Sequence, residues 1–547
     1  MRKAIEITPP AAQHSVRHSP PRPLPRYASI MAQHWSSEWG GLEWRVELRE
    51  VAGDGGPSLR LGPCDGPHEW LRFDCFERDP HWHLDPGGRD ETHALDEQGD
   101  PIAESFGLLR GELRGLLERA GADPASAERA AAGLAEISQA GDVSRPAGRF
   151  LLAAERAMRH RPARVEDLDP RQLARRHSEK WHTYPRDVLP AWVAEMDFPV
   201  AAPIEDELRR FIAISDLGYP IAPGQTGLAE VFAARMLERF DWSPDPARVE
   251  ILSEVVQGMY LALEAFAHRG EGAIVQTPIY PPFLGAVRDT GRQLVENRLV
   301  VSDERLELDL AGLDAGIEPT TRVLMLCNPH NPSGRVFSRS ELEALAERVI
   351  AHDLVVVSDE IHADLVFDDR RHIPFATLSP EIAARTVTLT SPSKAFNMPG
   401  LRCAIAHFGD PELQRRFARA VPRHVRGGIG LLGIHASIAA WRWAQPWLDE
   451  VLPYLAANRD FARSRLAERL PEIRFFTPEG SYLAWLDCAG LELDASPAAH
   501  FLRHGRVALS DGRAFGEGWE RYARLNLATS RAILGEAIDR MAKALGR

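Results

Sequence analysis

Apolar and polar residues alternate in two segments of the first part of the chain. The alternation covers residues 44–51 and 70–76, and clusters rich in glycine and proline stand at 53–57 and 62–67. A period of two predicts strands with one buried face, and the clusters predict the turns between them. We therefore expect hairpin-linked strands in this region.

Further along, the apolar period lengthens to that of a helix. Apolar residues recur at i, i+3 and i+4 spacing between positions 106 and 120, and Gly121 ends the run. Asp123 stands directly before Pro124, an order typical of an N-cap followed by the first helical residue. Together with the strands, these helices predict an N-terminal α+β accessory module over residues 35–158.

The remainder of the chain alternates strands with helices. The runs at 323–326 and 354–357 are apolar throughout, as expected of strands buried on both faces of a parallel sheet. Between them, residues 338–352 place their apolar side chains on one helical face. This order predicts an α/β fold over residues 170–547, with the chemistry at the carboxyl ends of the strands.

Two segments follow neither pattern. Residues 1–34 are rich in proline and lack the apolar stretch of a secretory signal, so we expect a disordered extension there. We also expect Met31 to be the natural start of the protein. The polar residues 159–169 are expected to link the two folded regions.

Composition limits the kinds of partner. The chain has 547 residues, enough for several domains, and its 65 basic and 78 acidic residues give a net charge of −13. This balance argues against binding to nucleic acid or to a membrane surface. The sequence has no run of about 18 apolar residues, so we expect no membrane-spanning helix. Five scattered cysteines do not form a disulfide framework, so we expect a cytoplasmic protein.

One segment carries a lysine in a distinctive setting. Lys394 is flanked by small hydroxyl residues, including Ser391, and is followed eight positions later by Arg402. A lysine that forms a Schiff base beside a phosphate needs such neighbours, because Ser391 and Arg402 can hold the phosphate while Lys394 reaches an aldehyde carbon.

Three further segments fit the same chemistry. Asp359 ends a buried run, where a carboxylate can keep a pyridine nitrogen protonated. Asn331 lies in an Asn-Pro turn after another strand and can donate to a phenolate oxygen, and Tyr280 can lie against the cofactor ring. Each residue alone has an ordinary structural explanation, but the set in this order favours a cofactor site.

These segments resemble the fold-type I pyridoxal-phosphate enzymes of the class I/II aminotransferase superfamily. Within it they most resemble the cysteine-S-conjugate β-lyases of the cystathionine β-lyase-like PatB/MalY branch. The matching stretches are 192–198, 217–219, 328–334, 359–362, 391–402, 482–487 and 524–526.

The resemblance implies how the second region is divided. A large domain with a mostly parallel seven-stranded sheet would span about residues 220–430. A small α+β domain would combine 170–219 with 431–547.

The resemblance also implies roles around the cofactor ring. Lys394 would form the aldimine with pyridoxal 5'-phosphate and later carry the Cα proton. Asp359 would pair with the pyridinium nitrogen, and Asn331 and His362 would lie by the phenolic oxygen. Tyr280 would stack on the ring.

Other roles concern the phosphate and the substrate. Arg524 would bind the α-carboxylate of an amino-acid substrate with two parallel hydrogen bonds. Tyr219 would reach the phosphate of a neighbouring subunit, which implies a homodimer. Val255 and Val256 stand where backbone amides should face the phosphate, although Glu254 adds an anion there.

The implied reaction is the β-elimination of an S-substituted, cystathionine-like cysteine to a thiol, pyruvate and ammonia. Position 362 supports this branch, because related aminotransferases usually have tyrosine where this chain has His362. An aminotransferase remains an alternative, and so does a cofactor-binding regulatory or scaffold protein whose function lies in the N-terminal module.

The N-terminal module contains one cluster of metal-ligand residue types. His81 and His83 would share one face of a strand, and His68 or Cys75 could join them around a metal. We favour the interpretation that these residues form the rim of a hairpin, and we expect no metal site in the chain.

Overall fold

The computed structural model describes residues 35–51, 54–64, 68–96, 99–132, 134, 145–302 and 305–547. The predicted disordered extension and the proposed start at Met31 therefore lie outside the described residues. Within the described ranges, no helix has the length and apolar character needed to cross a bilayer.

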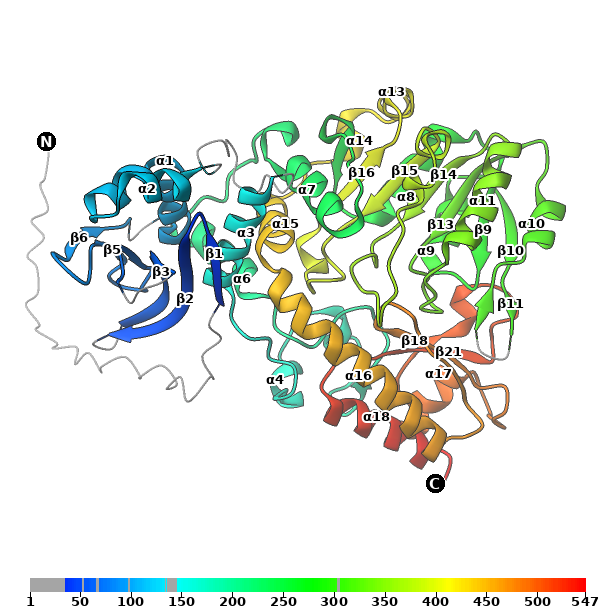
Figure 1. Ribbon diagram of the computed structural model, residues 1–547. Coiled ribbons are helices and arrows are strands. Elements are labelled where there is room, and N and C mark those ends of the chain that lie inside the picture. Colours follow the sequence, from blue (N-terminus) through cyan, green and yellow to red (C-terminus); the bar gives the residue numbers. More distant parts are fainter. Residues whose placement is uncertain are drawn as a thin grey trace, which may run out of the picture.

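The N-terminal part is an antiparallel meander of six strands packed against helices (Figure 1). The strands follow one another in chain order across the sheet. They are β1 (Trp35–Trp39), β2 (Leu42–Val51), β3 (Asp54–Pro63), β4 (Leu71–Asp74), β5 (His81–Leu84) and β6 (Glu91–Ala94), and the helices are α1 (Pro101–Arg119), α2 (Pro124–Ala131) and α3 (Pro146–Arg159).

Sequence patterns explain these elements. Alternate residues of β2, such as Trp44, are buried in the core, and the apolar stripe of α1 from Phe106 to Leu117 packs against the same core. The carboxylate of Asp123 accepts a 3.0 Å hydrogen bond from the backbone N–H of Ser126. The predicted helix over positions 106–120 and the predicted cap at Asp123 are confirmed.

A seven-stranded sheet organises the second region, with strand order β10-β9-β13-β14-β15-β16-β8. The five strands from β10 to β15 are parallel, whereas β16 runs antiparallel to both of its neighbours. The strands are β8 (Val249–Leu252), β9 (Gly272–Thr277), β10 (Gln293–Arg298), β13 (Thr321–Cys327), β14 (Val355–Asp359), β15 (Thr386–Thr390) and β16 (Ala404–Phe408). The mostly parallel seven-stranded sheet is confirmed.

Helices cover both faces of this sheet. One apolar core joins it to α8 (Val255–Phe266), α9 (Pro281–Asp289) and α13 (Pro411–Ala420). On the other face lie α10 (Leu310–Gly316), α11 (Arg339–Ala351) and α12 (Pro380–Ala383). The predicted helix over positions 338–352 is confirmed as α11, which Ser338 and Glu341 begin with a reciprocal capping box.

A second sheet has the order β17-β18-β21-β20 and is antiparallel throughout. It packs against the long helix α16 and the C-terminal helix α18. The elements are α16 (Gln445–Arg469), β17 (Arg474–Phe476), β18 (Leu483–Asp487), α17 (Pro497–His500), β20 (Ser510–Asp511), β21 (Tyr522–Asn526) and α18 (Arg531–Lys543).

Shorter elements connect these layers. A two-stranded parallel ladder joins β7 to β19, and an antiparallel one joins β11 to β12. The remaining elements are α4 (Pro170–Leu173), α5 (Glu179–His182), β7 (Leu189–Pro190), α6 (Ala202–Ala213), α7 (Leu228–Phe240), β11 (Val300–Val301), β12 (Leu306–Glu307), α14 (Arg423–Arg426), α15 (Leu431–Trp443) and β19 (Val507–Ala508).

The N-terminal part contacts the second region through α3, which lies beside α15 (Figure 1). Arg156 on α3 pairs with Glu238 at the end of α7, and its Nε donates to the carbonyl oxygen of Arg442 at 2.8 Å. His160 lies 2.7 Å from the carboxylate of Glu450. Polar contacts of this kind at partly buried positions hold the two parts together.

Candidate active site

The parallel strands bring the predicted residues to one edge of the seven-stranded sheet. Asp359 ends β14, Asn331 follows β13, Lys394 follows β15 and Tyr280 follows β9. Carboxyl ends of parallel strands share one edge, so these side chains line one cleft. The space it leaves free of protein atoms, open solvent at its mouth included, is about 700 Å³. Its lining also includes Ala194, Ser253, Glu254, Val255, Val256, Met259, Cys327, Ile361, His362, Ser391, Ser393, Pro399, Arg402 and Cys403.

The amine of Lys394 has one hydrogen-bond partner, the backbone carbonyl oxygen of Ala194, at 3.0 Å. Burial and the nearby Arg524 guanidinium lower the pKa of Lys394 from 10.5 to about 8, against the opposing effect of the Asp359 carboxylate. A substantial share of the amine is therefore neutral, and nucleophilic, near neutral pH.

The carboxylate of Asp359 is buried at the centre of the sheet edge. One of its oxygens accepts a 3.0 Å hydrogen bond from the backbone N–H of Ile361. Burial raises the pKa of Asp359 to about 7, because Lys394 offsets only part of the desolvation. A pyridinium N–H would supply the cationic partner that this buried carboxylate lacks, so the site fits the ring nitrogen of pyridoxal phosphate.

Asn331 and His362 lie at a second corner of the cleft. The Asn331 Oδ1 atom accepts a 2.9 Å hydrogen bond from Arg524 Nη1, which leaves its Nδ2 group available as a donor. Burial lowers the pKa of His362 to about 3, so the imidazole is neutral. Its Nδ1 atom is buried without a hydrogen-bond partner. These groups suit the phenolic oxygen of the cofactor.

The first turn of α8 and the turn that contains Ser391 line the part of the cleft where the phosphate is predicted to bind. Val255 and Val256 begin α8, whose N-terminal backbone N–H groups have no helical acceptors. The guanidinium of Arg402 pairs there with the carboxylate of Glu254. Glu254, the anion expected near the phosphate, is therefore paired with Arg402, the arginine predicted to bind the phosphate.

Arg524, the residue predicted to bind the substrate, is bonded to Asn331 of the cleft lining. Its Nη2 group donates to the carbonyl oxygen of Trp192 and to Ser510 Oγ, both at 3.0 Å, and its Nε is buried without a partner. Burial lowers the pKa of Arg524 to about 10, so the side chain stays cationic at neutral pH. A fixed cation with an unsatisfied donor suits an α-carboxylate.

The loop 192–198 contributes Ala194 to the cleft lining. Ala194 places its carbonyl oxygen toward Lys394 and also accepts a 3.1 Å hydrogen bond from the buried Tyr482 hydroxyl. Asn397 donates to the carbonyl oxygens of Met196 and Phe198. Asn526 donates to the same loop at Val193 and Glu195. Asn397, Tyr482 and Asn526 lay inside matching stretches, and that was their only sequence signal.

A buried ion pair fixes the base of this loop. The ammonium of Lys180 lies 3.0 Å from a carboxylate oxygen of Asp197, and both side chains are 1% exposed. Trp181 donates to the same carboxylate at 2.6 Å, and Lys180 also donates to the carbonyl oxygen of Glu195. The loop is therefore tied to α5 by charged hydrogen bonds.

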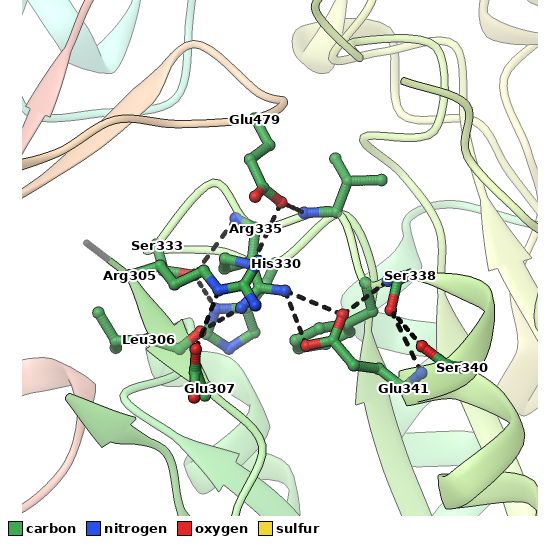
Figure 2. A network of polar contacts seen from close by, with 12 residues as sticks. Arg305, Leu306, Glu307, His330, Ser333, Arg335, Ser338, Ser340, Glu341 and Glu479 are labelled. Carbon is green, nitrogen blue, oxygen red and sulfur yellow. Dashed lines mark hydrogen bonds and ion pairs between the residues drawn. The ribbon is translucent and has the colours of Figure 1, made fainter. Parts of the chain in front are cut away.

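A polar network supports the turn that presents Asn331 (Figure 2). Arg335 donates to the carbonyl oxygen of Leu306 at 2.5 Å and pairs with Glu341 on α11 and with Glu479. The carbonyl oxygen of Gly334 accepts hydrogen bonds from the backbone N–H groups of Glu479 and Gly480, each at 2.8 Å. The turn is thus fixed both to α11 and to the loop before β18.

Tyr219 is the one predicted cofactor-binding residue that lies outside this cleft. Its side chain is fully exposed, beyond the end of α6. Within one chain it therefore contacts no other predicted site residue.

The N-terminal cluster differs from the combination considered from the sequence. The ring of His68 lies 3.2 Å from Asp85, and the Cys75 thiol is buried against Ser105, where burial raises its pKa to about 12. Neither lies with His81 and His83. The residue that joins these two histidines is Asp74.

Comparison with known proteins identifies the second region. The family model described as aminotransferase class I and II matches residues 225–541, and a model described as a domain of unknown function (DUF7700) matches residues 37–140. A putative cystathionine β-lyase of Mycobacterium leprae is 39% identical over 70% of this chain and 98% of its own. Cystathionine β-lyase PatB of Bacillus subtilis is 35% identical over 66% of this chain and 93% of its own.

A solved structure agrees with these relatives. The putative PLP-dependent β-cystathionase of Corynebacterium diphtheriae is 32% identical, covers 70% of this chain and 100% of its own, and superposes with a TM-score of 0.67. The cleft described above accommodates the same cofactor. The chain belongs to the class I and II aminotransferase family of pyridoxal-phosphate enzymes, in its cystathionine β-lyase-like branch.

Proposed function

We propose that this protein is a carbon–sulfur β-lyase that cleaves an S-substituted, cystathionine-like cysteine to a thiol, pyruvate and ammonia. The observation that carries the proposal is that Lys394, Asp359 and Asn331 line one cleft, while Arg524 bonds to Asn331 and lies near enough to lower the pKa of Lys394. The names of the relatives support the same activity.

Pyridoxal phosphate, when bound, supplies an electron sink for the charge left at Cα after proton removal. Asp359 would keep the ring nitrogen protonated, and Asn331 and His362 would hold the phenolic oxygen. Ser391, Arg402 and the first turn of α8 would hold the phosphate. Tyr280, partly buried on the cleft wall, would pack on the ring.

Two residues act on the substrate itself. Arg524 would bind the α-carboxylate and thereby orient the amino acid. Lys394 would then remove the Cα proton, because its lowered pKa gives a neutral amine that can accept a proton near neutral pH. The electrons of the Cβ–S bond leave with the thiolate while the pair left at Cα forms a Cα=Cβ bond. Water then hydrolyses the released enamine to pyruvate and ammonia.

The loop 192–198 would exclude water from the amine. Its carbonyl oxygens are held by Tyr482, Asn397 and Asn526, so the loop presents a fixed backbone to Lys394. Exclusion of water lowers the local dielectric constant and so strengthens the electrostatic effect of Asp359 and Arg524 on the reacting groups.

Incubation of the purified, cofactor-loaded protein with cystathionine and with S-methylcysteine, each with and without 2-oxoglutarate as an amino acceptor, tests the proposal. A lyase releases one thiol and one pyruvate per substrate consumed. An aminotransferase instead forms a keto acid that retains the sulfur. Keto acid without thiol or pyruvate would refute the lyase activity, and no turnover of any S-substituted cysteine would favour the regulatory or scaffold alternative.

We also infer a homodimer in which each subunit completes the other's site. Apolar side chains stand exposed around the end of α6 and in the loop beyond it; they are Ile212, Ile214, Leu217, Tyr219 and Ile221. A patch of this kind is typical of an interface. Tyr219 would then reach the phosphate end of the neighbouring cleft. We propose a cytoplasmic location, which the five free cysteines support.

A further inference from the structure

A second constellation of ligand-type side chains lies in the N-terminal part, on strands β4 and β5. Asp74 on β4 pairs in register with His81 on β5, and His83 follows two residues later on the same face. The alternate residues Phe73 and Trp82 point into the core against α1. Asp74, His81 and His83 therefore gather on the opposite face of the sheet.

Hydrogen bonds fix how the two imidazoles are oriented. The Nδ1 atom of His81 lies 2.7 Å from the carbonyl oxygen of Asp79, and that of His83 lies 2.6 Å from a carboxylate oxygen of Asp90. These oxygens accept, so both Nδ1 atoms carry the proton. In the neutral rings, each Nε2 atom then presents a lone pair.

Both Nε2 atoms face the same carboxylate oxygen. Oδ2 of Asp74 lies 3.7 Å from His81 Nε2 and 3.4 Å from His83 Nε2. His83 is 8% exposed, and its Nε2 atom is buried without a hydrogen-bond partner. Oδ2 already accepts hydrogen bonds from Arg72 Nε at 2.9 Å and from Arg49 Nη1 at 3.2 Å. A metal ion beside it would in addition satisfy the lone pairs of the two imidazoles.

The spacing matches a metal site. Metal–nitrogen and metal–oxygen bonds of about 2.0–2.1 Å in tetrahedral geometry separate two ligand atoms by about 3.4 Å. All three ligand atoms of the cluster lie within 4.8 Å of one another. A ligand histidine that donates its other N–H to a carbonyl or carboxylate is the usual outer-shell arrangement, and both histidines have it.

Asp74 lies in a network of charged side chains. Arg49 and Arg72 both donate to this carboxylate, at 3.1 and 2.9 Å. Each guanidinium also faces a glutamate, Arg49 with Glu47 and Arg72 with Glu69. Arg60 pairs with both of these glutamates, at 2.8 and 3.5 Å, so three arginines face three carboxylates and the network as a whole is neutral.

We propose that Asp74, His81 and His83 bind a divalent transition-metal ion such as Zn²⁺. Three protein ligands leave the fourth tetrahedral position open to water or to an exogenous ligand. This proposal departs from the expectation that the chain has no metal site. Its third ligand is Asp74, whereas the sequence had suggested His68 or Cys75.

A second histidine cluster provides a matched control. His500 and His504 lie near Asp494. His500 binds the exposed Asp494 carboxylate through Nδ1 at 2.7 Å. The ring nitrogen of His500 that lacks a partner among the described residues, Nε2, is therefore not the one that faces the cluster. We propose no site at this cluster.

The test uses the full-length, cofactor-loaded protein, stripped with a chelator and titrated with Zn²⁺ and with Co²⁺. We expect one equivalent of metal by elemental analysis and visible Co²⁺ absorption of a four-coordinate site. H83A and the half-buried H81A should weaken binding at least about 100-fold, since loss of an outer-shell partner alone costs 10–100-fold. H500A should bind as the wild type does.

Circular dichroism and thermal unfolding of each variant separate loss of a ligand from loss of the fold. If H83A unfolds, the milder H81A decides the question. The proposal is wrong if the wild-type protein binds no metal, if folded H81A binds it with unchanged affinity, or if H500A abolishes binding.

Discussion

Arg524 donates a 2.9 Å hydrogen bond from Nη1 to the side-chain oxygen of Asn331. The bond joins β21 of the small sheet to the turn after β13 of the large sheet, across 193 residues of sequence. It orients the Asn331 amide so that its NH₂ group stays available to the cofactor. The residue proposed to bind the substrate therefore also positions a residue proposed to bind the cofactor.

Replacement of Arg524 by lysine should impair substrate binding more than cofactor binding. Arg524→Lys keeps the charge but loses the planar set of donors, and a hydrogen bond to a charged group is worth about 1.5–3 kcal/mol. We expect kcat/KM to fall about 10- to 100-fold, mainly through KM, while the visible cofactor absorbance persists. The control is Arg513→Lys, an exposed arginine paired with Asp511. An unchanged KM in Arg524→Lys would contradict the assignment.

The pH dependence of cofactor uptake should reflect the lowered pKa of Lys394. Only the neutral amine attacks the aldehyde, and a pKa of about 8 in place of 10.5 makes it available at lower pH. At pH 7.5 about a quarter of the amine is neutral, against about 0.1% for an unperturbed lysine. The rate of reconstitution, measured by absorbance in stopped flow above the titration of Asp359, should rise with a midpoint near pH 8.

Above about pH 9 this rate should level off, because the amine is then almost fully neutral. A rate that keeps rising tenfold per pH unit beyond pH 9.5 would mean that Lys394 titrates as an ordinary lysine.

Removal of the Glu254 carboxylate should strengthen cofactor binding. In the structure Arg402 pairs with Glu254, so the phosphate competes with this carboxylate for the guanidinium. Glu254→Gln should lower the dissociation constant of pyridoxal phosphate up to about fivefold, the worth of an exposed ion pair. Equilibrium titration measures the change. Glu250→Gln, which breaks the pair with Arg426, is the matched control and should leave affinity unchanged. Weaker binding in Glu254→Gln would show that this carboxylate helps to hold the phosphate end.

Mixing two inactive variants tests whether Tyr219 acts in the neighbouring cleft. Tyr219→Ala should weaken cofactor binding, and Lys394→Ala should abolish turnover. Dimers that contain one subunit of each variant hold one complete site. An equimolar mixture, after subunit exchange, should therefore regain about a quarter of the wild-type activity. Activity equal to the mean of the two separate variants would exclude a shared site.

The central site could be predicted because its residues follow strands. Asp359 ends β14, while Asn331 and Lys394 stand four residues beyond β13 and β15, and parallel pairing of these buried strands brings such positions to one edge. The helix over positions 338–352 could also be predicted from the sequence, because its apolar spacing and its cap are local features.

Other parts depend on contacts that the sequence does not display. The acceptor for Lys394 is a backbone carbonyl oxygen at Ala194, and any residue type could supply it. The Arg402–Glu254 pair spans 148 residues. Asp74 joins His81 because of the register between β4 and β5, whereas the nearby His68 turns to Asp85.

The account rests on Lys394 as the residue that binds the cofactor covalently, and reductive trapping tests this most directly. The sequence contains four lysines, Lys3, Lys180, Lys394 and Lys543, so the assignment is unambiguous. After reduction of the cofactor-loaded protein with borohydride, peptide mass spectrometry should find the cofactor on Lys394 alone. A label on Lys180 or Lys543, or no label on a protein that still binds the cofactor, would contradict the account.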